Sequence, residues 1–120
     1  MGMKPQEIES KEAELTAKYN RKVTIKRFLL PNGEEAFLSL KNPQFYEKMM
    51  AYDQFAQSQM AAATYLFNAS AIKEESDERF WSEKEEHEEL RMGALIHCLD
   101  LVSYAIPEVK KKIGEAVEFL

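Results

Sequence analysis

The sequence predicts an α+β fold, in which an N-terminal β-hairpin is followed by a mostly helical C-terminal part. Two observations carry this prediction. Two short, partly apolar segments flank the turn-forming residues Pro31-Asn32-Gly33, and after Asn42-Pro43 apolar residues recur at three- and four-residue steps. Turn residues between alternating segments are typical of a hairpin, whereas three- and four-residue steps are typical of amphipathic helices.

The 120 residues are predicted to form a single domain, 1–120, because one domain usually takes ~100–200 residues. A composition of 45% hydrophobic and 31% charged residues excludes a fully disordered chain. The first twenty residues contain no apolar stretch typical of a secretory signal, and no apolar run is long enough to cross a membrane. We therefore expect a cytoplasmic protein without membrane contact.

Residues 1–20 are expected to form a loosely docked helix, covering about residues 5–20. Pro5 suits the first turn of a helix, since its missing N–H is not needed there. Ile8, Leu15 and Tyr19 are the main apolar positions, so this helix has little surface to bury.

Residues 22–41 are predicted to form the hairpin. Pro31 fixes the first turn position and Gly33 can take the positive φ that closes the turn. In the first strand the apolar phase shifts from the odd positions Val23 and Ile25 to the even position Phe28, which predicts either a bulge or burial of both faces. Two strands alone are marginal in water, so they must pack on a helix or pair with another chain.

Residues 43–120 are predicted to be helical. Asn42 as N-cap and Pro43 at the first position predict a helix over 43–72, about 40 Å long if straight. A helix of that length must bend or turn part of its surface toward a partner. A second helix is expected over 77–105, with Ser82-Glu83-Lys84-Glu85 as a capping box and Pro107 as its end, followed by a short tail helix.

The predicted core is a set of large apolar residues from the second strand and the two main helices. Its members are Leu38, Leu40, Phe45, Leu66, Leu95 and Leu99.

Neither histidine nor the single cysteine indicates catalysis. His87-Glu88-Glu89-Leu90-Arg91 lacks the second histidine of a zinc-protease helix, so a solvated acidic helix start is the favoured interpretation. Cys98 lies on the apolar stripe of its helix, where burial raises the pKa of a thiol. Phosphate-binding glycine loops and nucleophile motifs are missing from the sequence. We therefore predict no enzyme activity, no catalytic residue, no cofactor and no metal.

Charge is uneven along the chain, which carries −5 overall. Between Lys73 and Glu89, nine acidic residues stand against three basic ones. This segment repels a polyanion, so we expect no nucleic-acid partner.

A protein-binding surface is the remaining expectation. The long helical stripe carries more apolar side chains than a small domain readily hides, and large exposed apolar patches usually mark interaction sites. The hairpin edge is expected to add a second contact through backbone pairing. The candidate interface residues are Met49, Met50, Tyr52, Phe55, Met60 and Trp81.

Taken together, the order of segments resembles the small tail assembly chaperones of long-tailed phages and prophages. The resemblance is carried by the hairpin KVTIKRFLLPNGEEAFLSLKNP, the helix after Asn42-Pro43, the segment AAATYLFNASAI and the closing helix from Leu90 to Val102. It implies a non-enzymatic protein of the bacterial host cytoplasm that forms a homo-oligomer and coats the tape measure protein before the tail tube polymerises. The alternative is a small regulatory or adaptor domain, such as an antitoxin-like inhibitor, that binds one folded partner.

The sequence leaves four points open. These are the identity of the client, the oligomer number, the existence of a longer frameshifted product, and whether the apolar residues of the long helix are core or interface.

Overall fold

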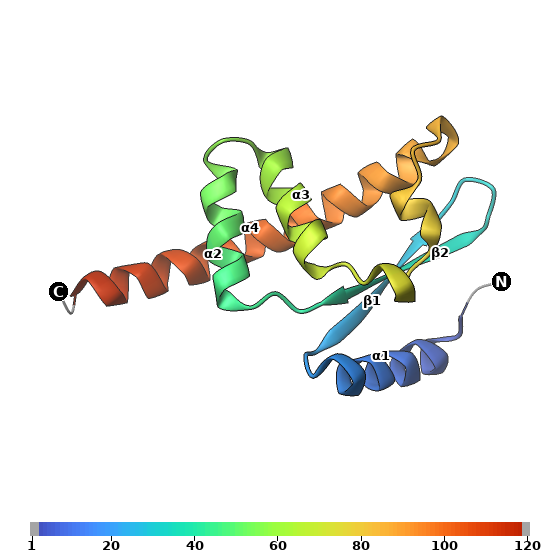
Figure 1. The fold of residues 1–120 in the computed structure, drawn as a ribbon, viewed down its shortest axis with the longest axis horizontal. Coiled ribbons are helices and arrows are strands. Elements are labelled where there is room, and N and C mark those ends of the chain that lie inside the picture. Colours follow the sequence, from blue (N-terminus) through green and yellow to red (C-terminus); the bar gives the residue numbers. More distant parts are fainter. Residues whose placement is uncertain (1–2, 119–120) are drawn as a thin grey trace. The chain divides into compact units, whose positions relative to one another are not determined.

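The computed structural model describes residues 3–118, and the side chains of residues 3–115. It has the predicted α+β architecture, a two-stranded antiparallel sheet followed by a mostly helical part. In chain order the elements are α1 (Pro5–Tyr19), β1 (Val23–Leu29), β2 (Glu35–Lys41), α2 (Phe45–Phe55), α3 (Gln59–Ser70), the 3₁₀ turns η1 (Lys73–Glu75), η2 (Glu78–Trp81) and η3 (Glu85–His87), and α4 (Glu88–Glu118) (Figure 1). Residues 119 and 120, part of the predicted helical region, lie outside the described residues.

The chain divides into two compact units, each built from two segments. The hairpin unit comprises Met1–Asn42 and Ser70–Ala94, and the helical unit comprises Pro43–Ala69 and Leu95–Leu120. The helix α4 contributes residues to both. Each unit is described by itself below.

The hairpin forms as predicted. Its strands pair without interruption from Val23 opposite Lys41 to Leu29 opposite Glu35. At the turn, Gly33 N donates to Leu30 O at 2.9 Å, and Gly33 has a φ of +89°. A side chain is strained at this φ, which explains why glycine occupies the last turn position.

Both faces of the hairpin carry buried side chains, although Thr24 and Lys26 of β1 are exposed, and the uninterrupted pairing shows that β1 contains no bulge. On one face, Val23 and Ile25 pack with Leu15 of α1. On the other, the Phe28 ring lies 5.1 Å from the Phe80 ring in an edge-to-face arrangement. The shift of apolar phase along β1 therefore reflects two different partners for the two faces.

The outer edge of each strand is occupied. Along β1, the N–H groups of Val23 and Ile25 donate to the side chains of Thr16 (3.0 Å) and Glu12 (2.8 Å) on α1. Along β2, Ser39 O accepts from Ile72 N at 2.9 Å, and Ser39 N donates to the Ser76 hydroxyl at 2.9 Å. The helix α1 and residues 71–77 thus take the places of neighbouring strands.

The predicted helix over 43–72 is wrong in both its start and its continuity. The helix α2 begins at Phe45 rather than Pro43, because Gln44 and Glu47 form a reciprocal capping box. It ends at Phe55, and α3 begins at Gln59. Between them, the Ser58 hydroxyl accepts from Ala61 N at 3.1 Å and caps the new helix.

The predicted helix over 77–105 is also corrected at both ends. Residues 78–81 and 85–87 form the 3₁₀ turns η2 and η3, and α4 begins only at Glu88. The Ser82 hydroxyl accepts from Lys84 N at 3.1 Å instead of forming the predicted capping box. At the other end, α4 runs through Pro107. Pro107 and Ser103, the residue four positions earlier, are both exposed, so water can bond the carbonyl that lacks its helical donor.

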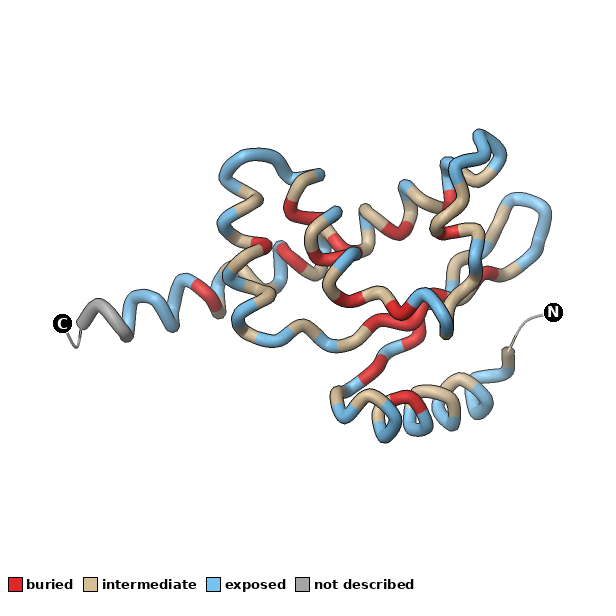
Figure 2. Tube along the Cα trace, viewed as in Figure 1, coloured by how far each residue is buried: buried red, intermediate tan, exposed pale blue. Residues whose placement is uncertain are grey.

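Half of the predicted core is confirmed. Leu38, Leu40 and Leu66 are at most 5% exposed, whereas Phe45, Leu95 and Leu99 are partly exposed. Buried positions occur along all the helices and both strands (Figure 2). They include small residues such as Ala36 and Ala94, which sequence patterns rank low.

Candidate functional site: an exposed apolar surface and a cleft at the hairpin tip

The predicted interface residues are divided between the two units. Met49, Met50, Tyr52 and Phe55 lie on α2 and Met60 on α3, all in the helical unit, whereas Trp81 lies in the hairpin unit. Met49 is 39% and Met60 is 38% exposed, and the other four are partly exposed. The candidate set is therefore not wholly core, and its members belong to both units.

The adjacent aromatic residues Phe80 and Trp81 have different roles. Phe80 is 3% exposed and belongs to the core of the hairpin unit. Trp81 is partly exposed, and its ring lies 6.4 Å from the Phe80 ring at 85°. Of these two neighbouring aromatic side chains, only Phe80 enters the core of the hairpin unit.

Other exposed apolar side chains were missed by the sequence interpretation. Within the described residues these are Leu29, Tyr46, Met92, Ile96, Tyr104 and Ile113, each at least 40% exposed. Tyr46 and Met49 are neighbours on α2, three residues apart. On α4, Ile96 and Tyr104 are eight residues apart, and the exposed Asp100 lies between them. The signal that could have found the α4 pair is its position opposite the buried Cys98 and Val102.

The helical unit joins α2 to α4 through charged side chains. Lys48 Nζ lies 2.8 Å from Glu108 Oε2, and Lys112 Nζ lies 4.5 Å from the centre of the Phe45 ring. The hydrogen bond from Lys48 lowers the pKa of the Glu108 carboxyl. On α3, burial of Tyr65 raises the pKa of its hydroxyl.

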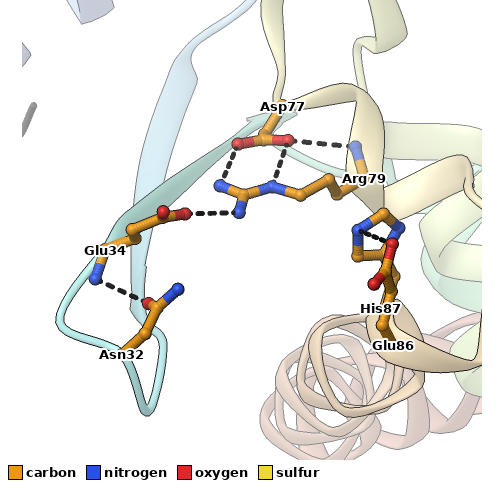
Figure 3. A network of polar contacts seen from close by, with 6 residues as sticks. All are labelled: Asn32, Glu34, Asp77, Arg79, Glu86 and His87. Carbon is orange, nitrogen blue, oxygen red and sulfur yellow. Dashed lines mark hydrogen bonds and ion pairs between the residues drawn. The ribbon is translucent and has the colours of Figure 1, made fainter.

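In the hairpin unit a polar network surrounds Arg79 (Figure 3). Its Nε and Nη2 donate to the two oxygens of Asp77 at 3.0 and 2.8 Å, and its Nη1 donates to Glu34 Oε2 at 2.9 Å. The hydrogen bond from Arg79 lowers the pKa of Asp77, and the same bond raises the pKa of Arg79. This guanidinium ties η2 to the end of the hairpin turn.

A cleft of about 390 Å³ opens beside this network. Its lining residues come from the hairpin tip, from η2 and η3, and from the start of α4: Leu30, Pro31, Asn32, Arg79, Glu86, His87, Glu89 and Leu90. The acidic residues of the predicted solvated helix start are exposed, whereas the side chain of His87 is only 21% exposed and its Nδ1 lies 2.7 Å from the Ser82 hydroxyl oxygen.

The described residues offer no metal centre. Among residues 3–118, no three His, Cys, Asp or Glu side chains are grouped so that they could hold a metal ion. Cys98 is fully buried, and burial raises the pKa of its thiol to about 12. A thiol in this state is a poor nucleophile at neutral pH.

One helical segment changes a sequence expectation. Glu85–Glu115 is long and apolar enough to cross a membrane, with a mean hydropathy of 1.2 over eighteen residues. The prediction that no apolar run reaches this length is therefore wrong by this measure. A core helix of a soluble protein passes the same test, so length and composition alone do not assign α4 to a membrane.

The described residues thus combine exposed apolar side chains with a cleft that carries acidic residues. Comparison of the chain with protein-family models, with curated proteins and with solved structures finds no match.

Proposed function

We propose that the protein is a non-enzymatic tail assembly chaperone of a long-tailed phage or prophage, which self-associates and coats the tape measure protein during tail assembly. The resemblance of its segment order to that family supports the proposal. The hairpin followed by helices is the one part of that resemblance for which the structure gives direct support.

The observation that carries the proposal is the exposure of large apolar side chains. Within the described residues, eight such side chains are at least 38% exposed. Single exposed apolar residues are normal, but Tyr46 and Met49, three residues apart, are neighbours on one face of α2. Apolar faces on a small acidic protein suit a subunit that masks an extended apolar client while repulsion between charged segments keeps the complex dispersed.

Light scattering over a concentration series tests self-association. We expect the average mass to rise with concentration, and the double substitution Met49→Ser and Met60→Ser to reduce this rise while the melting temperature changes little. The matched control is Gln57→Ser with Gln59→Ser, which changes two exposed polar side chains of the same segment. A strict monomer at high micromolar concentration contradicts the coating function. A collapse of stability in the double variant shows that these methionines are core.

The proposal implies that a tape measure protein is encoded close to this protein, and co-expression with that protein tests the client. We expect one client chain to carry many copies of this protein, as measured by the mass of the purified complex. A one-to-one complex with a folded partner instead supports the regulatory or adaptor alternative.

A further inference from the structure

The cleft at the hairpin tip combines an apolar wall with an acidic rim. Leu30, Pro31 and Leu90 provide the apolar part, and Glu86 and Glu89 provide carboxylates. Its volume of about 390 Å³ lies at the small end of the range of ligand pockets, which suits one side chain better than a large ligand.

The two carboxylates at the rim have little existing ion pairing. Within the described residues, Glu89 forms no ion pair, and Glu86 meets only His87 Nε2, at 3.7 Å. The side chain of Glu86 is 69% exposed, so a ligand can reach it. An added cation would therefore gain partners without breaking a strong existing contact.

An anion does not fit the same cleft. Arg79 is the one arginine in the lining, and Asp77 and Glu34 already hold its guanidinium (Figure 3). A phosphate would face Glu86 and Glu89 without a free guanidinium to offset the repulsion. A metal ion is disfavoured as well, because the described residues group no three suitable ligands.

We propose that this cleft binds a lysine or arginine side chain of a partner polypeptide. The aliphatic stem lies against Leu30, Pro31 and Leu90, and the charged end meets Glu86 and Glu89. Long basic side chains commonly bury their stems on apolar surface while their charge stays near water or a carboxylate. The inference rests on the proposed function in taking the occupant to be a polypeptide, and it adds the chemistry of the segment that is recognised.

Peptide titration followed by NMR tests the inference. The probe is an acetylated, amidated pentapeptide with lysine between two leucines, and its reference is the same peptide with norleucine in place of lysine. We expect the lysine peptide to shift the methyl signals of Leu30 and Leu90 and the ring signals of His87, and to bind more tightly than the norleucine peptide. Increasing the salt concentration should weaken the binding of the lysine peptide and leave the binding of the norleucine peptide unchanged.

Charge-neutral variants locate the binding. The double substitution Glu86→Gln and Glu89→Gln should weaken the lysine peptide roughly 3- to 30-fold, as expected for the loss of two exposed ion pairs. The matched control is Glu83→Gln with Glu85→Gln, which makes the same charge change in the same segment outside the cleft lining. A second variant, Leu30→Ala, should weaken both peptides, because it removes apolar wall rather than charge.

Four outcomes overturn the inference. They are no shift at millimolar peptide, equal binding of the lysine and norleucine peptides, equal effects of the two glutamine pairs, and binding of a free diamine as tight as that of the peptide. None of these bears on self-association, which the light-scattering series measures separately.

Discussion

Arg79 joins two segments of the hairpin unit that are distant in sequence. Its guanidinium bonds Asp77 in its own turn and Glu34 at the end of the hairpin loop. Because the pKa of Asp77 is lowered in the folded chain, its ionised form stabilises the fold above the ordinary carboxylate pKa of ~3.9. That contribution is lost as the pH falls through the lowered pKa.

Replacing Arg79 should therefore change how stability depends on pH. Arg79→Met should lower the free energy of unfolding at neutral pH, because Asp77 and Glu34 then stand close together without a cation. The difference from the parent should shrink as the pH falls through the lowered pKa of Asp77, because a protonated Asp77 no longer gains from the guanidinium. Urea unfolding at neutral and at acid pH measures the difference. Arg79→Lys keeps the charge but not the paired geometry, so its free energy of unfolding should lie between those of the parent and of Arg79→Met. A difference that is the same at both pH values would mean that Arg79 acts by packing.

Burial separates two leucines that look alike in the sequence. Leu66 is 2% exposed, whereas Leu99, also expected in the core, is partly exposed. We expect Leu66→Ala to lower the free energy of unfolding by ~2–5 kcal/mol, and Leu99→Ala by clearly less, since its cavity stays open to water. Chemical denaturation of both variants makes the comparison. Equal losses would show that Leu99 packs as tightly as Leu66.

At the scale of elements, α1 acts as a cover for the outer edge of β1. An exposed strand edge presents unpaired N–H groups that can pair with another chain. Here Thr16 and Glu12 accept the N–H groups of Val23 and Ile25. The expected backbone pairing through the hairpin edge, which stays a prediction, therefore requires α1 or residues 71–77 to move away.

Removing the two acceptors should free the β1 edge. In the double variant Glu12→Leu and Thr16→Val, the amide hydrogens of Val23 and Ile25 should exchange roughly three- to tenfold faster, as expected for the loss of one hydrogen bond each. Native-state hydrogen exchange measures this directly. The amide of Lys26 points toward β2 by the alternation of an antiparallel pair and serves as the internal control. Unchanged exchange at Val23 and Ile25 would show that burial by α1, and not these acceptors, protects the edge.

Sequence patterns predicted the elements whose conformation depends on neighbouring residues in the chain. The hairpin turn needs a residue tolerant of positive φ, and Gly33 supplies one. The break between α2 and α3 escaped prediction because a serine cap at Ser58 is a weak signal inside a continuous apolar stripe. The passage of α4 through Pro107 escaped it because the rule that proline ends a helix assumes that the freed carbonyl is buried.

At the scale of the whole molecule, the candidate site was only partly predictable. Its exposed methionines could be suggested from their spacing, since a long stripe exceeds what a small core needs. The cleft could not, because its lining combines the hairpin tip with Arg79 and with the start of α4, segments that meet only through tertiary folding. The expectation that the acidic run repels polyanions stays a prediction, and which of its carboxylates form ion pairs depends on that folding.

Cys98, the single cysteine of the chain, has one further consequence. Its side chain is fully buried and its pKa is raised to about 12, so almost no thiolate is present or reachable in the closed state at neutral pH. A thiol reagent can therefore react only during moments when the surroundings of Cys98 in the helical unit come apart. With no second cysteine to compete, the rate of labelling in native buffer reports how often α4 opens at this position. A loss of labelling on mixing with a partner would then show that the partner slows this opening.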